Sequence, residues 1–410
     1  MSGQFGRFSR LKWTWCLGAT VCTVAHPAFG QDATPAPRTE IRVSATDAYE
    51  DNALRLGTAQ PVPAGFVRND FRFTPSLDLN IVRPLGQQSI FLAATLGYDF
   101  YHRNTLLNRE RVKVTGGADL RFGGNCAQHI QGSASRQQSD LRDFTRAIRL
   151  ANAEQRLTAG AALSCGGGLG LKGGLTYDYE TVSNDQPLRQ ISNYNAHTLG
   201  ASFGYVSPVL GEIGVFGSYR LGRYPQRRAL AGLGRSDGVD VFNAGVRFSR
   251  SIGTRLRGSV SLGYSKVNPK LAGTPRFSGA SYSADLTWTA NDRLRTKIDI
   301  GRSVSQSNLL DVSYSIDDSY AISNSFAINQ SMTATFGGSV LKRRFRDSPV
   351  LGANPIGRGD RVGQYAGGID YHPPGRIGFA VDVSRGRRSA DVQQFDYRYL
   401  TARITLRVKI

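Results

Sequence analysis

Arginine is the residue type in this chain that points most clearly to chemistry. The sequence holds 51 lysine and arginine residues against 31 acidic ones, and only 8 of the 51 are lysine. A guanidinium group binds carboxylate and phosphate in a planar fork that an ammonium group cannot reproduce. Many of these arginines lie in stretches where polar and apolar residues alternate, so they fall on one face. Nine are expected on that polar face: Arg72, Arg121, Arg220, Arg247, Arg257, Arg293, Arg295, Arg403 and Arg407.

Two interpretations of these arginines carry equal weight. Rings of arginine or lysine give a pore a preference for anions. The same guanidinium groups could instead pair with acids on the same face, for which Asp78, Asp119, Asp299 and Asp382 are candidates.

Motifs for catalysis or metal binding are weak. The five histidines, His26, His102, His129, His197 and His372, show no HxxxH spacing. A GxSxG string at 200–204 lies inside an alternating stretch with no helix pattern after it, so a nucleophile elbow is not expected. The glycine-rich run at 166–174 lacks the GxxxxGK[ST] order of a phosphate loop. The sequence therefore predicts no enzyme, no metal site and no cofactor.

The elements that would position the arginines are long alternating stretches. In 280–290, Ala280, Tyr282, Ala284, Leu286 and Trp288 oppose serine, aspartate and threonine. Period two indicates a strand with two different faces. The stretches are about twice the five or six residues usual for a sandwich strand, which fits a tilted strand that crosses a bilayer. No run of 18 apolar residues follows residue 30, so a transmembrane helix is not expected there.

The turn signals divide the chain into 18 expected strands. They are 40–52, 70–83, 89–101, 111–122, 126–140, 154–165, 170–183, 194–206, 211–222, 240–250, 254–266, 277–289, 293–303, 315–327, 332–345, 361–371, 377–385 and 395–410. Long and short connections alternate, and both the first and the last are long. An outer-membrane barrel has this pattern of short periplasmic turns and long outer loops. The fold class predicted is an all-β, transmembrane, antiparallel up-and-down β-barrel of 18 strands, with 16 as the alternative.

Two cysteines, Cys126 and Cys165, would open one strand and close the next at the same rim. An exported protein can form disulfides, and a disulfide needs Cα atoms within about 7 Å. The alternatives are a disulfide between them or two unpaired thiols.

The N-terminus indicates export. Arg7, Arg10 and Lys12 precede an apolar stretch, and Ala28-Phe29-Gly30 resembles a cleavage site. We expect a signal peptide at 1–30, a short periplasmic tail at 31–39 and one outer-membrane barrel at 40–410. Export makes nucleic acid a poor partner for a chain of charge +20. The basic stretches 223–239 and 342–360 could contact phosphates of lipopolysaccharide or guide an anionic polymer.

The segment from Val43 to Leu56, VSATDAYEDNALRL, resembles the opening of the EpsL-like proteins, also called β-barrel porin type 2. Members typically have a Tyr-Asp-Asp-Asn-Leu-Phe-Arg-like segment at the end of the first strand. Glu50 replaces the first Asp here, and Ala53-Leu54 stands for Leu-Phe. The specific resemblance covers about 60 residues. It implies a role beside exopolysaccharide synthesis and export, with anionic polysaccharide and periplasmic export machinery as partners.

Three functions follow from these observations. The first is an outer-membrane pore in exopolysaccharide export or assembly, with an arginine-rich lumen. The second is a general or anion-preferring porin for small solutes. The third is an outer-membrane barrel enzyme that acts on lipid or polysaccharide.

Overall fold

A computed structural model describes residues 37–410 except 124, 140–151, 228–236, 308–311 and 349–356. The expected signal peptide, most of the expected tail and parts of both basic stretches therefore lie outside the described residues. No helix in the described part of the chain is long and apolar enough to cross a membrane.

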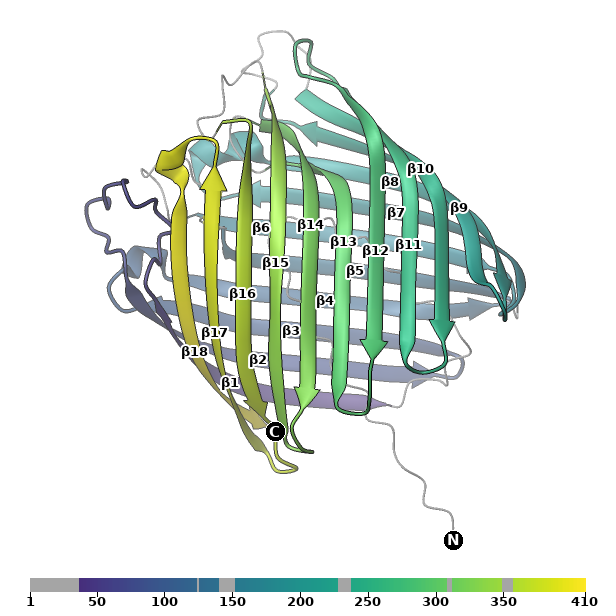
Figure 1. Ribbon diagram of the computed structural model, residues 1–410, viewed down its shortest axis with the longest axis horizontal. Coiled ribbons are helices and arrows are strands. Elements are labelled where there is room, and N and C mark those ends of the chain that lie inside the picture. The colour runs from purple at the N-terminus through teal and green to yellow at the C-terminus, as the bar shows by residue number, and fades with distance from the viewer. Residues whose placement is uncertain (1–36, 124, 140–151, 228–236, 308–311, 349–356) are drawn as a thin grey trace.

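The described chain forms one antiparallel sheet of 18 strands that closes on itself (Figure 1). Each strand pairs with the next in sequence, and β1 also pairs with β18 from Arg42 opposite Lys409 to Glu50 opposite Thr401. The predicted 18-strand barrel is confirmed. The strands are β1 (Arg38–Glu50), β2 (Asp70–Leu85), β3 (Gln88–Tyr101), β4 (Arg109–Phe122), β5 (Cys126–Gln138), β6 (Ala153–Cys165), β7 (Gly170–Asn184), β8 (Tyr194–Ser207), β9 (Gly211–Tyr224), β10 (Asp237–Ile252), β11 (Leu256–Pro269), β12 (Phe277–Thr289), β13 (Leu294–Gln306), β14 (Val312–Ala327), β15 (Met332–Asp347), β16 (Gly359–Tyr371), β17 (Ile377–Ala390) and β18 (Tyr397–Lys409).

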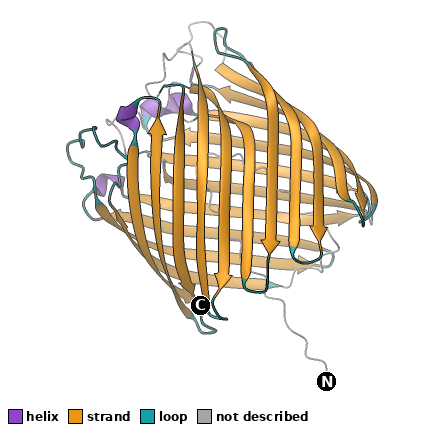
Figure 2. Ribbon diagram, viewed as in Figure 1, coloured by secondary structure: helices purple, strands orange, loops and turns teal. Residues whose placement is uncertain are grey.

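The connections sort into two rims. Eight turns of two to five residues lie at one end, which we call the short-turn rim. The other nine connections, from 51–69 to 391–396, lie at the opposite end, the long-loop rim. In the described part of the chain, the short 3-10 helices η1 (Thr105–Leu107), η4 (Pro187–Ser192) and η5 (Gln393–Phe395) all belong to the long-loop rim (Figure 2). Gly86 and Gly253 adopt positive φ in short turns, a conformation that glycine reaches without a steric cost.

The outer surface of the barrel is apolar. Large exposed hydrophobic side chains occupy every second position of the strands, as Val246 and Phe248 do on β10 and Leu262 and Tyr264 on β11. Aromatic side chains gather toward both rims of this surface, and the band between them is mostly aliphatic. Such girdles mark the two membrane interfaces of a transmembrane barrel. Exposed aromatic residues toward the long-loop rim include Phe71, Phe73, Tyr98, Phe100, Tyr219 and Tyr264, and those toward the short-turn rim include Phe122, Phe203, Tyr205, Phe248, Trp288, Phe326, Phe336 and Phe379.

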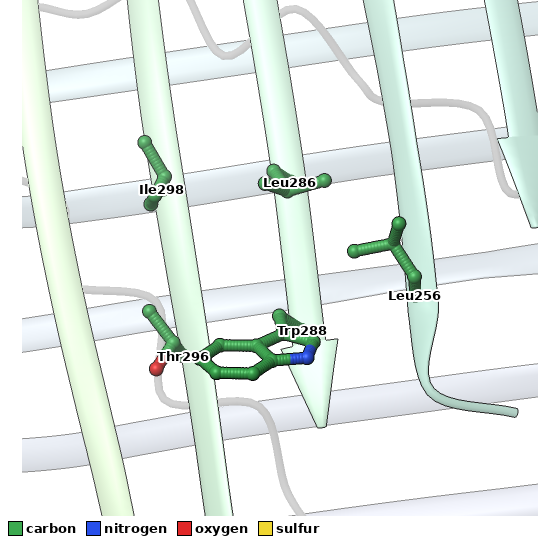
Figure 3. A pocket seen from close by; sticks show the side chains of 5 residues that line it. All are labelled: Leu256, Leu286, Trp288, Thr296 and Ile298. Carbon is green, nitrogen blue, oxygen red and sulfur yellow. The ribbon is translucent and has the colours of Figure 1, made fainter. Parts of the chain in front are cut away.

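One shallow apolar pocket illustrates the girdle at the short-turn rim. Figure 3 shows the indole of Trp288 on β12 reaching toward Thr296 on β13, with Leu286 and Ile298 farther along the same strands. Amphipathic aromatic rings are favoured at the level of lipid headgroups.

Several strands extend farther toward the long-loop rim than the sequence predicts. The expected connections 223–239, 346–360 and 386–394 shorten to 225–236, 348–358 and 391–396. β17 continues to Ala390 because Arg388 points inward and binds the buried carboxylate of Asp360, which keeps this charged end in the ladder. A strand end rich in charged residues resembles a loop in the sequence, because the residues that neutralise its charges are on another strand and far away in the chain.

The two faces of the strands should respond differently to a new charge. We expect Leu262→Arg, on the lipid-facing side of β11, to destabilise the barrel by about 2–4 kcal/mol because the guanidinium must enter hydrocarbon. Ser283→Arg, on the opposite face of the neighbouring strand β12, should change stability little. Urea unfolding in phospholipid vesicles measures both, and equal losses would contradict the assignment of faces.

Candidate functional site

The inward face of the barrel carries eight of the nine arginines predicted from the sequence, and those toward the long-loop rim are paired. Arg72 lies 3.2 Å from Glu50 and 3.8 Å from Asp99, and its side chain is mostly buried. A guanidinium that neighbouring carboxylates neutralise holds strands together and adds little net positive charge to the lumen.

A second network crosses β6 to β9. Glu180 on β7 accepts hydrogen bonds from Arg220 (2.7 Å) and Tyr194 (3.0 Å) and also binds Arg156. Arg156 is not among the predicted lumen arginines, although its alternation with Leu157 and Leu163 places it on the inward face. The alternation was therefore a signal that could have identified it.

A third network, largely buried, lies near the ends of β15, β16 and β17. Asp360 accepts hydrogen bonds from Arg343 at 2.7 Å and from Arg388 at 2.8 Å. Sequence reasoning missed Asp360 and Arg388 because it assigned 346–360 and 386–394 to connections. Arg343 lay within the expected strand 332–345 but was not named as a lumen residue. A buried charge requires partners such as these, since an unpaired one costs several kcal/mol.

The C-terminal arginines are paired as well. Arg403 binds Asp382, with 2.7 Å between Nε and Oδ1, and Arg407 binds Asp370 at 2.7 Å. The other acids proposed as partners bind different groups. The Asp119 carboxylate lies 2.7 Å from His129, Lys297 binds Asp299 at 2.8 Å, and Asp78 accepts a hydrogen bond from Thr95.

Four of the predicted arginines differ from these because they have no acidic partner among the described residues. They are exposed, they lie on the inward face in the half of the barrel near the short-turn rim, and no ion pair to them occurs among the described residues. They are Arg121 on β4, Arg247 on β10, Arg257 on β11 and Arg295 on β13. Arg247 donates only to the Ser261 hydroxyl, at 3.2 Å. We call these four residues the free lumen arginines.

Arg293 lies one residue outside the strand to which the sequence assigned it. β13 begins at Leu294, and Arg293 lies exposed in the preceding turn, where its backbone N–H donates to the Asn291 side chain. The Asn291 side chain accepts hydrogen bonds from two successive backbone N–H groups and so ends the turn one residue later than predicted.

The most irregular part of the wall is the long-loop end of β13 and β14. Tyr320 and Ile322 of β14 are exposed on the lipid-facing side. Tyr314 and Ile316 lie on that same face of the strand, yet both are fully buried against Val239 and Val241, which lie on the inward face of β10. The same face of β14 therefore meets lipid at Tyr320 and Ile322 and packs against the inward face of β10 at Tyr314 and Ile316. This is possible because the end of β14 bends into the lumen. We call this end, residues 304–307 and 312–316, the inward tip.

The inward tip is held against strands that are not its neighbours in the sheet. Tyr224 on β9 donates its hydroxyl to the Ser313 carbonyl at 2.8 Å and accepts from the Ser307 N–H at 3.1 Å. Arg220 donates to the side chain of Gln306 at 2.8 Å. Gly222 leaves room for this contact, because a Cβ there would lie 1.8 Å from the Gln306 amide nitrogen. The tip therefore narrows the lumen beside the Glu180 network.

Arg227 adds a further anchor. Its side chain is fully buried, pairs with Asp237 at 3.0 Å and donates to the Val312 carbonyl at 3.2 Å. The guanidinium also lies 3.8 Å from the centre of the Tyr224 ring. Each of these groups would be costly to bury alone, so the tip and the rim stabilise each other.

The cysteines and the GxSxG string singled out in the sequence are both parts of the barrel wall. Cys126 and Cys165 are directly opposite on β5 and β6 and form a disulfide at the short-turn rim, with Cα atoms 4.1 Å apart. The GxSxG string lies within β8. Among the described residues no group of three or more histidines, cysteines or acids is arranged to hold a metal ion.

Comparison with known families gives one match. Residues 176–410, more than half of the chain, match the family described as Putative beta-barrel porin 2. No match to a curated protein was found.

Solved structures of bacterial barrels show distant similarity. Pseudomonas aeruginosa OccK2 (OpdF), solved in complex with glucuronate, has 11% identity over 91% of this chain and 98% of its own, with a TM-score of 0.45. The P. aeruginosa outer membrane protein OpdK has 11% identity, 91% and 99% coverage and a TM-score of 0.45. OpdL of the same species has 12% identity, 91% and 98% coverage and a TM-score of 0.44.

Release of the inward tip should widen the pore. Tyr224→Phe removes two hydrogen bonds, each worth about 0.5–1.5 kcal/mol, and favours a tip that leaves the β9 wall. We expect a higher and noisier single-channel conductance in planar bilayers. Tyr219→Phe is the matched control, since this hydroxyl bonds Asp240 on the lipid-facing side of the same strand. A conductance unchanged in Tyr224→Phe would show that the tip does not limit the pore.

Proposed function

Because the chain belongs to the Putative beta-barrel porin 2 family, we propose that it is an outer-membrane pore that passes anionic solutes. The solutes would carry carboxylate or phosphate groups, since these match the guanidinium fork. The long-loop rim would face outward and the short-turn rim would face the periplasm. The proposal includes a signal peptide at 1–30 that exports the chain, and it assigns no reaction to the barrel.

The observation that carries the proposal is the uneven pairing of the lumen arginines. Toward the long-loop rim, Arg72 and Arg220 are each bound to carboxylates and are largely buried. Toward the short-turn rim, the free lumen arginines face water and have no ion pair among the described residues. An unpaired guanidinium in a pore attracts anions and repels cations.

Three of the free lumen arginines are close together in the sheet. Arg257 on β11 is opposite Ser251 of β10 and Thr287 of β12, while Arg247 is opposite Ser261. Serine and threonine therefore surround the arginines on this part of the wall. Arg295 lies two strands farther along, opposite Thr289 and Ser325. An anion that leaves one guanidinium meets hydroxyl groups and then another guanidinium, an arrangement that favours passage over tight binding.

Export of an acidic exopolysaccharide is the second candidate. It rests on the resemblance of the segment from Val43 to Leu56. In the structure the end of this segment packs at the long-loop rim, where Ala53, Leu54 and Leu56 are buried with Tyr101 and Leu107. These residues account for a packed loop and do not line the lumen. The inward tip also favours small solutes over a polymer chain, so we place the small-solute pore first.

Ion selectivity tests the proposal. We expect the triple variant R247S/R257S/R295S to lose most of its preference for chloride over potassium, because three unpaired charges leave the lumen. The reversal potential across a planar bilayer with a KCl gradient measures this preference. The matched control R385S/R387S/R398S removes three exposed arginines from the lipid-facing side and should keep the wild-type value.

Two outcomes would contradict the proposal. One is a wild-type pore that prefers cations. The other is an unchanged reversal potential in R247S/R257S/R295S. Loss of acidic exopolysaccharide secretion on deletion of the gene, with no anion preference in the purified pore, would favour the second candidate.

A further inference from the structure

A groove of about 720 Å³ runs across the outside of β13 to β18. Its apolar part is lined by Ile298 and Ile300 of β13 and by Tyr320 and Ile322 of β14. All four lie on the face that the barrel turns toward lipid. The other end is lined by Arg385 and Arg387 of β17 and by Arg398 of β18. The groove therefore joins an apolar trough to a cationic end on the membrane side of the wall.

The floor of the groove is formed by glycine. Gly338 on β15 and Gly363 on β16 both line it, and each occupies a lipid-facing position. A Cβ built on Gly363 would meet no atom within 4 Å. The missing side chains leave a depression between the apolar part and the arginines.

The direction of the groove follows the strand pairing. Ile300, Tyr320, Val340, Gly363, Arg387 and Arg398 stand opposite one another in successive strands. Strands of a closed barrel are tilted, so a row perpendicular to them changes depth in the membrane from one strand to the next. Arg398 is the second residue of β18, immediately after the connection at the long-loop rim. The cationic end thus lies at that rim, and the apolar end lies deeper in the membrane.

The three arginines lack acidic partners. All three side chains are exposed, and no ion pair to them occurs within the described residues. Arg387 and Arg398 stand directly opposite each other in the ladder. Like charges at directly opposed positions destabilise a sheet, so this pair needs an anion that the protein does not supply.

The neighbouring lipid-facing cations show the same imbalance. Lys342 on β15 stands directly opposite Arg361 on β16, and both are exposed. By contrast, Arg302 on β13 and Arg344 on β15 both bind the carboxylate of Asp318 on β14, the strand between them. Beside the groove, over β15 to β18, the positive charge is therefore left without a carboxylate partner among the described residues.

We propose that this groove binds one phosphorylated lipid of the outer leaflet, of the lipid A type. Its phosphates would bind Arg385, Arg387 and Arg398, and an acyl chain would lie along Ile298, Ile300 and Ile322. Charge complementarity selects this occupant, because a lipid supplies both the anion at the rim and the chain at depth. The inference rests on the outer-membrane location proposed above, since lipid A is found in that membrane's outer leaflet.

Native mass spectrometry of the full-length mature barrel in detergent, with bisphosphorylated lipid A as the probe, tests the proposal. We expect one lipid A per wild-type barrel and at least about a tenfold weaker affinity for R385S/R387S/R398S, since a lost charge-assisted hydrogen bond is worth about 1.5–3 kcal/mol. Gly363→Leu should weaken binding as well, because it fills the floor while all the arginines remain. Lipid A without its two phosphates should bind wild type weakly. Its affinity should be similar to that of bisphosphorylated lipid A for R385S/R387S/R398S.

The lumen variant R247S/R257S/R295S is the matched control and should bind lipid A as wild type does. Equal binding by wild type and R385S/R387S/R398S, or equal loss in both triple variants, would overturn the lipid site. An unchanged reversal potential in the lumen variant would overturn the pore proposal and leave lipid binding standing. The two proposals can therefore fail separately.

Discussion

Backbone hydrogen bonding in a medium without water is the constraint on which this structure depends. Each N–H and C=O group within hydrocarbon needs a partner from the protein, and a sheet provides one for every group only when it has no edge. The pairing of β1 with β18 removes the edge. Closure then fixes which side of each strand meets lipid and which meets the lumen, because successive side chains point to opposite faces.

The charged groups are distributed according to that geometry. Arginines on the inward face pair with carboxylates from neighbouring strands toward the long-loop rim, as Arg343 and Arg388 do with Asp360. Toward the short-turn rim, Arg407 binds Asp370, whereas the free lumen arginines have no ion pair among the described residues. The inward tip is the one described departure from a regular wall, and it is stabilised by Tyr224 and Arg227, whose hydrogen bonds reach across strands that are not adjacent. The constriction therefore forms where the bent end of β13 and β14 packs against the inward face of β9 and β10.

Much of the fold follows from the sequence, while the details of the site do not. Alternation and turn residues predict eighteen strands and place Arg247 and Arg257 on the inward face. They fail at Tyr314 and Ile316, whose alternation assigns them to lipid although tertiary contacts bury them inside. They fail also at Arg388, since its partner Asp360 lies 28 residues away in the chain. The cationic end of the lipid-facing groove depends on the register between β17 and β18, which periodicity alone does not determine.

The alternation of faces along a single strand is the most direct test of the account. Single cysteines at successive positions 280–287 of β12, in membrane vesicles, can be treated with a water-soluble maleimide that enters the lumen. The account predicts labelling at Ser281, Ser283, Asp285 and Thr287 and protection at Ala280, Tyr282, Ala284 and Leu286. Uniform labelling, or a period near 3.6 residues, would contradict a closed barrel with lipid on one face and water on the other.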